Sequence, residues 1–339
     1  MRIVLIRLSA LGDIVHTWPL AVAIRAARPQ AHLTWIVEKP LAPLVVDHPA
    51  VDAVLTVATG RWRKQPFSIR TRTEVAAFKS RVRELQPDLS IDAQGTLKSG
   101  LITRWCKAER RVGLARPWRR EIVAGLAYTE TLPGSNSQRH VIATNLELVR
   151  SVGAEPPARL TQPDGRWLLD DARLEYPDSR ENEYSVILPG AGQPQKILSA
   201  TTLADTARFL VSSGMDVVVA WGPSERDRAI EIVKLGGRGV HLAQPTNLIE
   251  LTSLLGSAAV VVGGDTGPVH LAASLGVPTL AVFLTTDPER NGPAGERVGI
   301  VSGAAPGRGP GGSATTGQAR SVAVSEICTS IEHLLGSHE

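Results

Sequence analysis

Strand-like and helix-like segments alternate along the whole chain, and this alternation constrains the fold more than any other feature of the sequence. The opening run RIVLIRL, residues 2–8, is short and rich in β-branched residues and leucine, and a helical pattern follows from about residue 14 to 27. Further strand patterns fall at 32–38, 51–57, 88–94 and 111–114, with helical patterns at 74–86 and 96–106. Strands and helices that alternate at this spacing predict a parallel sheet covered on both faces.

A polar, proline-rich segment at 151–182 separates this series from a second one. The second series has strand patterns at 184–190, 215–222, 239–243, 258–265 and 278–284, and helical patterns at 200–213, 224–235, 247–256, 268–275 and 325–335. A chain of 339 residues exceeds what one hydrophobic core usually supports. We therefore expect two α/β domains, at 1–160 and 183–339, joined by a linker at 161–182. The last helix can pack back on the first domain, and the Gly-rich stretch 303–317 is expected to be a loose insertion.

Charge is divided unevenly between the two halves. The formal net charge is +4, but residues 1–160 hold 24 Lys and Arg against 13 Asp and Glu, whereas the remainder holds 13 against 20. The positive excess of the first half indicates a negatively charged partner, such as phosphates, carboxylates or an anionic membrane surface. Nucleic acid is disfavoured, because aromatic residues make up only 4% of the chain and no helix-turn-helix or zinc-finger pattern occurs.

Cysteines and apolar runs indicate the cellular compartment. Cys106 and Cys328 lie far apart without metal-type spacing, which is typical of a reducing compartment. The first apolar run is interrupted by Arg7 and Asp13, and none of the later apolar runs is long enough to cross a bilayer. We therefore expect neither a signal peptide nor a membrane span. The sequence therefore predicts a cytoplasmic protein.

Asp13 follows the first strand pattern, in the turn S-A-L-G-D at 9–13. In an open parallel sheet, ligands bind at the carboxyl ends of the strands, and a helix N-terminus at that edge attracts anions. Asp13 is therefore a candidate catalytic carboxylate, although aspartate is also a common helix N-cap. His16 is expected on the same helical face, either as a substrate contact or as a packed side chain.

Basic side chains gather after the strands of the first half. The segment G-R-W-R-K at 60–64 follows one strand pattern, and we expect it to form a loop. Lys98 lies in the first turn of a helix, where a cation is unfavourable unless an anion binds nearby. Arg120 belongs to a further charged group. Arginine forks and lysine ammonium groups bind phosphates and carboxylates, so the cluster favours an anionic ligand, while a solvated surface is the alternative for each residue taken alone.

The strongest local pattern of the second half is VVVGGDTGPVHLAASLG at 260–276, in which a strand runs into a Gly-rich turn and a helix. The amides of this turn, with Thr266, suit a diphosphate, whereas a capped helix with a satisfied His270 is the alternative. Lys196 ends a Gly/Pro turn and can neutralise a leaving diphosphate, and Glu225 is suited to a ribose. Neither a P-loop nor a dinucleotide fingerprint is present, and no ligand spacing indicates a metal.

Taken together, these motifs resemble those of the ADP-heptose lipopolysaccharide heptosyltransferases, glycosyltransferase family 9. The resemblance covers most of the chain and rests on S-x-x-G-D-x-x-H-T at 9–17, R-W-R-K at 61–64, D-A-Q-G-x-x-K-S at 92–99, R-E at 120–121, W-G at 221–222 and D-T-G-x-x-H-L at 265–271. It implies an α/β fold of two facing Rossmann-like domains with an interdomain cleft, the GT-B arrangement. It also implies inverting transfer of L-glycero-D-manno-heptose from ADP-heptose to the first Kdo sugar of Kdo-lipid A, in lipopolysaccharide inner-core synthesis. The enzyme so implied needs no cofactor and lies at the cytoplasmic face of the inner membrane.

The same resemblance assigns roles to individual residues. It implies that Asp13 is the general base. The implied donor contacts are Lys196, Glu225, Thr246, Asp265, Thr266, Gly267 and His270. The implied acceptor contacts are His16, Arg61, Arg63, Lys64, Gln94, Lys98 and Arg120. The chain departs from the family at Ala191-Gly192, where relatives have hydroxyl residues, and at Ile197-Leu198, where relatives have an aromatic residue.

Two alternative functions remain at this point. One is a later-acting heptosyltransferase, which adds to an existing heptose; R-W-R-K and D-A-Q-G-x-x-K-S favour the first-heptose enzyme instead. The other is a non-catalytic nucleotide- or glycan-binding module, which the presence of Asp13, Lys196 and His270 disfavours.

Overall fold

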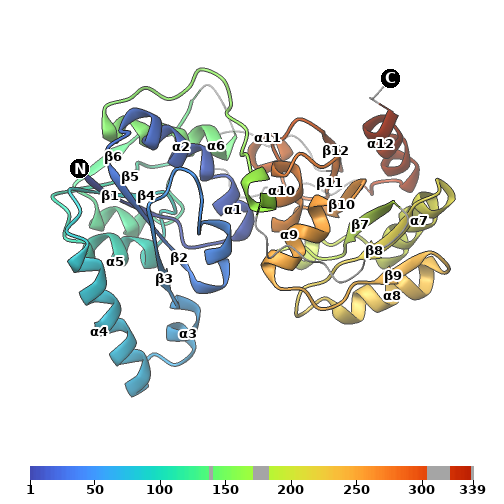
Figure 1. Cartoon of the computed structure of the whole chain (residues 1–339), viewed down its shortest axis with the longest axis horizontal. Coiled ribbons are helices and arrows are strands. Elements are labelled where there is room, and N and C mark those ends of the chain that lie inside the picture. Colours follow the sequence, from blue (N-terminus) through green and yellow to red (C-terminus); the bar gives the residue numbers. More distant parts are fainter. Residues whose placement is uncertain (137–139, 171–182, 304–320, 337–339) are drawn as a thin grey trace. The chain divides into compact units, whose positions relative to one another are not determined.

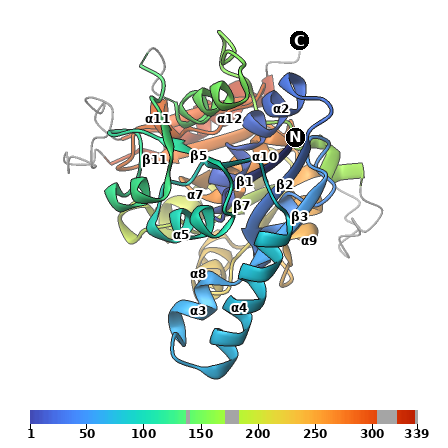
Figure 2. The same ribbon diagram turned by 90° about the vertical axis from the view of Figure 1, so that its left-hand side faces the viewer.

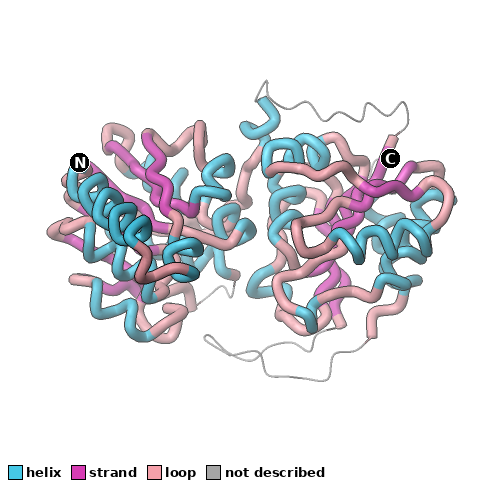
Figure 3. The backbone as a smooth tube through the Cα atoms, turned by 90° about the horizontal axis from the view of Figure 1, so that it is seen from below, coloured by secondary structure: helices cyan, strands magenta, loops and turns pink. Residues whose placement is uncertain are grey.

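The chain forms two compact units, Met1–Thr161 and Gln162–Glu339. The structure is a computed structural model that describes residues 1–136, 140–170, 183–303 and 321–336. Each unit is built on a parallel six-stranded sheet with helices on its faces (Figures 1 and 3). Within the expected linker and the Gly-rich stretch, residues 171–182 and 304–317 lie outside the described residues.

The sheet of the N-terminal unit has the strand order β3-β2-β1-β4-β5-β6, which is the Rossmann order. Its strands are β1 (Arg2–Ile6), β2 (His32–Glu38), β3 (Ala53–Val57), β4 (Leu89–Asp92), β5 (Arg110–Leu114) and β6 (Glu130–Leu132). Because helices cover both faces, the central strand β1 is buried from its second residue onward, and its continuous apolar sequence fits that environment.

Helices of the N-terminal unit follow most of the strands. They are α1 (Leu11–Val15), α2 (Trp18–Ala27), α3 (Thr59–Lys64), α4 (Ile69–Glu84), α5 (Leu97–Trp105) and α6 (Val141–Leu146), with the 3₁₀ helices η1 (Lys39–Leu44), η2 (Ile122–Ala127) and η3 (Glu147–Val152). The single helix expected at 14–27 is two helices, because Pro19 fits only a first helical turn and here lies in the first turn of α2. The segment 60–64, expected as a loop, lies in α3, and α3 and α4 extend together from the sheet (Figures 1 and 2).

The sheet of the C-terminal unit has the order β12-β11-β10-β7-β8-β9, which is the same arrangement built from the second series of strands. Its strands are β7 (Tyr184–Leu188), β8 (Asp216–Val219), β9 (Val240–Leu242), β10 (Val260–Gly264), β11 (Thr279–Phe283) and β12 (Val298–Ser302). The helical elements are η4 (Arg166–Asp170), η5 (Pro194–Lys196), α7 (Ala200–Ser212), α8 (Arg226–Gly236), α9 (Leu248–Gly256), α10 (Gly267–Ser274), α11 (Pro288–Asn291) and α12 (Val324–Gly336).

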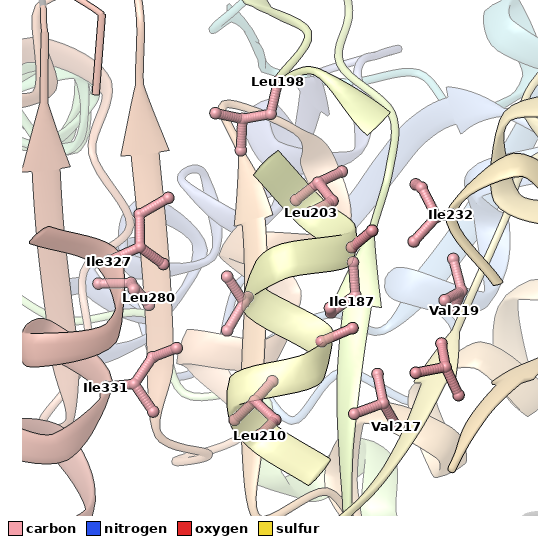
Figure 4. Packing of buried hydrophobic residues seen from close by; sticks show 14 of the residues in the cluster. Ile187, Leu198, Leu203, Leu210, Val217, Val219, Ile232, Leu280, Ile327 and Ile331 are labelled. Carbon is pink, nitrogen blue, oxygen red and sulfur yellow. The ribbon is translucent and has the colours of Figure 1, made fainter. Parts of the chain in front are cut away.

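Helices α7, α8 and α12 cover one face of this second sheet (Figure 4). The core between them contains Leu203 and Leu210 of α7 and Ile232 of α8, packed against strand residues. The last helix, α12, adds Ile327 and Ile331 to the same core. Its apolar side thus contributes to the core of its own unit.

Each sheet has one point at which the strand order reverses. In the first sheet this switch point lies between β1 and β4, and in the second it lies between β7 and β10. The loops that leave neighbouring strands at a switch point diverge to opposite faces of the sheet, which opens a crevice where ligands bind. Each unit therefore has one crevice, at its switch point, where the residues of the sequence motifs can bind a ligand.

Candidate active site

Asp13 lies at the switch point of the first sheet, in α1 directly after β1. The carboxylate is bound by two arginines. Arg7 Nη2 lies 2.6 Å from Oδ1, and Arg120 Nη2 lies 2.9 Å from Oδ1 and 2.8 Å from Oδ2. The N–H of Ala10 donates to Oδ2 over 3.1 Å. The carboxylate is therefore fixed by Arg7 just after β1, by the backbone of its own loop and by Arg120 in the loop after β5.

The two arginines differ in exposure, and this difference shapes the electrostatics of the site. The Arg7 side chain is 2% exposed, whereas that of Arg120 is 51% exposed. Burial alone would raise the pKa of Asp13, but the charges of Arg7 and Arg120, with the Ala10 hydrogen bond, outweigh burial and lower the pKa below its ordinary value. Asp13 is therefore ionised at neutral pH and can accept hydrogen bonds or a proton.

The loop after β4 is tied to the Asp13 loop by buried polar groups. Asp92 accepts the N–H groups of Gln94 and Gly95, each over 2.9 Å, and the hydroxyl of Tyr128 over 2.8 Å. Burial raises the pKa of Asp92. Gln94 Oε1 in turn accepts the N–H of Leu8 over 2.7 Å. The side-chain amide oxygen of Gln94 thus holds the backbone that leads to Asp13.

Arg120, in the loop after β5, and Lys98, in the first turn of α5, lie on two further segments at this site. The carboxylate of Glu121 accepts the N–H of Leu97 over 2.8 Å, which joins the loop after β5 to the start of α5. Gly95 permits this contact, because it has a φ of +69° and a Cβ there would lie 3.3 Å from the backbone nitrogen of Arg120. Lys98 Nζ donates to Ser9 over 3.2 Å, within the turn that precedes Asp13.

Other residues expected at the acceptor site lie elsewhere in the N-terminal unit. His16 is 3% exposed, and its ring packs edge-on against His140 at 5.3 Å between centroids, so the structure favours the packed alternative. Arg61 forms an ion pair with Glu74 of α4, while Arg63 and Lys64 are exposed on α3. The structure thus gathers Asp13, Gln94, Lys98 and Arg120 at the switch point and carries Arg61, Arg63 and Lys64 on the hairpin of α3 and α4.

The switch point of the second sheet carries another charged cluster. Lys196, after β7, lies with Nζ 2.6 Å from Oδ2 of Asp265, which follows β10. The hydroxyl of Thr286 donates to the same oxygen over 2.7 Å, and Nε2 of His270 lies 3.8 Å from Oδ1. Burial favours the neutral form of Asp265, but hydrogen bonds from His270, Lys196 and Thr286 outweigh it and lower its pKa. Thr266 is the N-cap of α10 and Gly267 its first residue, so their amides lie beside this cluster.

Glu225 and Thr246 lie in the loops after the next two strands, β8 and β9, at the same edge of the sheet. Glu225 Oε2 accepts the N–H of Gly222 over 2.8 Å. A Cβ at Gly190 would lie 1.7 Å from Glu225 Oε1, so only glycine leaves room for this carboxylate against the loop after β7. Of the departures from the family, Leu198 is buried in the core of the unit, and a Cβ at Gly192 would meet nothing within 4 Å.

Three residues of these clusters were absent from the sequence expectations. Arg7 was interpreted only as an interruption of the first apolar run, and Thr286 and Tyr128 stand outside any motif. Of the three, only Arg7 could have been found from the sequence, because it is a charged residue inside a buried strand pattern. Burying a charge costs free energy unless an opposite charge pairs with it, so a partner could have been expected.

Over the described ranges, no cluster of three or more His, Cys, Asp or Glu residues is suited to hold a metal ion. In the same part of the chain no helix combines the length and apolar character needed to cross a bilayer.

Two Rossmann-type sheets with charged clusters at their switch points define a protein of the nucleotide-binding α/β class. Residues 75–311, more than half of the chain, match glycosyltransferase family 9 (heptosyltransferase). The chain belongs to this family and is a glycosyltransferase. Lipopolysaccharide heptosyltransferase 1 of Pseudomonas aeruginosa is 33% identical over 296 residues, which cover 87% of this chain and 82% of that protein. The protein of that name from Escherichia coli K12 is 30% identical over 290 residues, covering 85% and 89%.

Solved structures match over nearly the whole chain. The Escherichia coli heptosyltransferase WaaC with ADP has a TM-score of 0.82 at 28% identity and covers 98% of this chain and 100% of its own. The same enzyme with ADP-2-deoxy-2-fluoro heptose has a TM-score of 0.78, and the Escherichia coli ADP-heptose heptosyltransferase II, at 18% identity, shares the fold with a TM-score of 0.75. The α/β fold with two Rossmann-like domains and the family expected from the sequence are therefore confirmed.

Proposed function

We propose that this chain is an inverting glycosyltransferase that moves L-glycero-D-manno-heptose from ADP-heptose to the first Kdo sugar of Kdo-lipid A. Family membership supports heptose transfer in the inner core of lipopolysaccharide, and the relatives quoted above carry the name heptosyltransferase 1. The matching WaaC structures with ADP and with an ADP-heptose analogue support an ADP-linked donor. The basic groups near Asp13 support an acceptor that carries carboxylates and phosphates.

Asp13 acts as the general base in this proposal. The acceptor hydroxyl loses a proton as it attacks the anomeric carbon, and a carboxylate placed for this step contributes typically about 10²–10⁴-fold. Arg120 is the exposed partner of Asp13, with 51% of its side chain accessible, so a carboxylate or phosphate of the acceptor can compete for it. Once Arg120 turns to the acceptor, Asp13 keeps Arg7 alone. Its pKa then rises, because burial is opposed by one charge fewer, and the carboxylate becomes a stronger base when the acceptor is bound.

The residues of the second switch point hold the donor and stabilise the departing ADP. Lys196 carries a positive charge, His270 offers a ring nitrogen, and the amides at Thr266 and Gly267 provide donors at a helix N-terminus. Glu225 and Thr246 contact the nucleoside. Because bond formation requires the acceptor hydroxyl next to the anomeric carbon of the donor, we propose that the two carboxyl edges act together on one reaction.

The protein works at the cytoplasmic face of the inner membrane in this proposal, in peripheral contact with it. The acceptor is a lipid, and the excess positive charge of residues 1–160 matches both its anionic groups and an anionic bilayer surface. Arg61, Arg63, Lys64, Gln94 and Lys98 remain acceptor residues in the proposal, Gln94 through the backbone that it holds. His16, whose ring packs against His140, is left out of it.

The single observation that carries the proposal is the Asp13 carboxylate, fixed after the central strand by Arg7 and Arg120. The test incubates the protein with ADP-heptose and Kdo-lipid A, follows the release of ADP, and weighs the product. Asp13→Asn is expected to lower turnover by about 10²-fold or more, while binding of ADP-heptose, measured by calorimetry, stays largely intact. Asp227→Asn, at an exposed aspartate in the first turn of α8, is the matched control and keeps turnover. Near-normal turnover of Asp13→Asn rejects the assignment of the base.

The alternatives are separated by the acceptor and by turnover. A later-acting heptosyltransferase would prefer an acceptor that already carries heptose, so both acceptors are offered side by side. The heptosyltransferase 3 of Escherichia coli is 22% identical to this chain, lower than the heptosyltransferase 1 proteins quoted, which favours the Kdo acceptor. A non-catalytic binding module would bind ADP-heptose and release no ADP with either acceptor.

A further inference from the structure

The connection between α3 and α4 exposes two large apolar side chains. Phe67 is 84% exposed and Ile69 is 83% exposed, and within the described residues only Leu126, at 82%, approaches these values among the large apolar side chains. Both lie at the far end of a hairpin that extends from the N-terminal unit (Figure 2). Side chains of this kind at a protruding turn stabilise nothing in their own fold and are typical of a surface that binds something apolar.

The hairpin itself is held by inward contacts. The Trp62 indole N–H donates to Glu74 over 3.1 Å, and its ring meets Phe78 at 5.6 Å between centroids. Phe78 in turn contacts Trp105 of α5, at 6.4 Å. The aromatic residues that fix α3 and α4 to the sheet thus point inward. The outward position of Phe67 and Ile69 is therefore a property of an anchored hairpin.

Positive charge surrounds the apolar pair on both sides. Residues 59–73 contain five Lys or Arg and no Asp or Glu. Four of them flank the apolar pair directly and are exposed, namely Arg63, Lys64, Arg70 and Arg72. The acidic residue that follows, Glu74, is already bound by Arg61, Trp62 and Arg70. An apolar tip with cations on each side matches the boundary between lipid headgroups and acyl chains.

We propose that residues 63–72, the hairpin tip, insert into the surface of a bilayer that contains anionic lipids. Phe67 and Ile69 enter the headgroup boundary, and the flanking cations contact lipid phosphates. A protein partner fits this surface less well, because the centres of protein interfaces are depleted in charged residues. The inference deepens the proposed function and rests on it for its purpose, since the tip would hold the acceptor residues of α3 at the surface where a lipid acceptor lies.

The first experiment measures binding of the full chain to sedimented vesicles. Vesicles of equimolar phosphatidylcholine and phosphatidylglycerol are expected to bind the protein more tightly than phosphatidylcholine alone, and added salt weakens the binding. The variant Phe67→Ser with Ile69→Ser is expected to lose about tenfold or more in affinity, because two apolar side chains no longer leave water. Arg72→Gln is expected to lose about fivefold, the effect of one cation near an anionic surface. Leu126→Ser removes an equally exposed apolar side chain from η2 and is expected to keep binding.

A second measurement separates this inference from the proposed reaction. Transfer to a deacylated acceptor in solution is expected to stay unchanged in the double variant, whereas transfer to acceptor embedded in vesicles falls with vesicle affinity. Failure of the wild type to transfer heptose to either acceptor overturns the proposed function and leaves the vesicle test valid. Wild-type binding equal to that of the double variant, equal loss in Leu126→Ser, or no preference for anionic vesicles overturns the inference.

Discussion

Replacing Arg7 by glutamine tests how the candidate base is held. The Arg7 side chain is 2% exposed, lies 2.6 Å from Asp13 and also donates to the carbonyl of Ala93. Removing one partner of a buried ion pair costs roughly 3–5 kcal/mol. Asp13 is 18% exposed and would keep Arg120 and the Ala10 N–H, so we expect the low end, about 3 kcal/mol of unfolding free energy at neutral pH.

The pH dependence of this loss follows from the direction of the pKa of Asp13. Against burial, the two arginines hold that pKa below its ordinary value. The stabilisation is therefore complete above the unfolded pKa of aspartate and is lost as the pH falls through the folded pKa. In Arg7→Gln burial is opposed by one charge fewer, so the pKa of Asp13 is higher than in the wild type and the carboxylate takes up a proton at a higher pH. The difference in stability from the wild type should accordingly shrink toward acid pH.

Two assays check this reasoning. Urea unfolding at several pH values measures the stability difference, and the acid limb of kcat/KM against pH is expected to move to higher pH, because it reports the base of the free enzyme. Arg2→Gln, at the exposed start of β1, is the control and should stay within about 0.5 kcal/mol of the wild type. Unchanged stability together with an unmoved acid limb would refute the role given to the Arg7 pair.

Two further predictions concern the other loops. Gly190→Ala places a Cβ 1.7 Å from Glu225 Oε1 and should displace that carboxylate. We expect the KM for ADP-heptose to rise about tenfold, which corresponds to about 1.4 kcal/mol of lost binding free energy. The control Gly192→Ala, with nothing within 4 Å of its Cβ, should change this KM little. Tyr128→Phe removes the hydroxyl that donates to Asp92 over 2.8 Å and should destabilise the protein by about 1–3 kcal/mol in thermal or urea unfolding. A hydrogen bond to the ionised carboxylate is stronger than one to the neutral carboxyl, so this loss should shrink as the pH falls through the pKa of Asp92, which burial raises. The opposite trend would count against the buried carboxylate.

Most of the fold could be predicted from the sequence because ten of its strands are short apolar runs, and most of these runs are followed by helical patterns. The two strands that were missed are the last of each sheet, β6 and β12. Glu130–Leu132 has three residues, and Val298–Ser302 is only partly buried, so neither has the continuous apolar run of a central strand. An edge strand forms through hydrogen bonds to the neighbouring strand, and a local sequence pattern does not show this pairing.

The candidate site was predictable as a set of loops, but not as a set of contacts. The sequence indicates that Asp13 and Lys98 follow strands, and parallel strands bring such loops to one edge of a sheet. It does not indicate that the side-chain oxygen of Gln94 accepts the N–H of Leu8, or that Arg7 pairs with Asp13. These contacts depend on which strands are neighbours in the sheet. His16 shows the same limit, since helical spacing placed it near Asp13 and packing against His140 buried it.

Each of the two switch points carries an aspartate paired with a cation, but the two cations differ in exposure and in their partners. Each holds an ionised aspartate against a cation from a neighbouring loop, but Arg120 is 51% exposed, whereas Lys196 is 17% exposed and shares Asp265 with Thr286. In the proposed reaction an incoming anion of the acceptor takes Arg120 from Asp13 at little cost in buried contacts, which frees the proposed base. In the same proposal, loss of Lys196 from Asp265 would leave that carboxylate charged beside the donor diphosphate, so we expect Lys196 to stay between the two anions and bridge them. This division suits the proposed transfer, because proton removal has to wait for the acceptor while the leaving group needs a charge that is already in place.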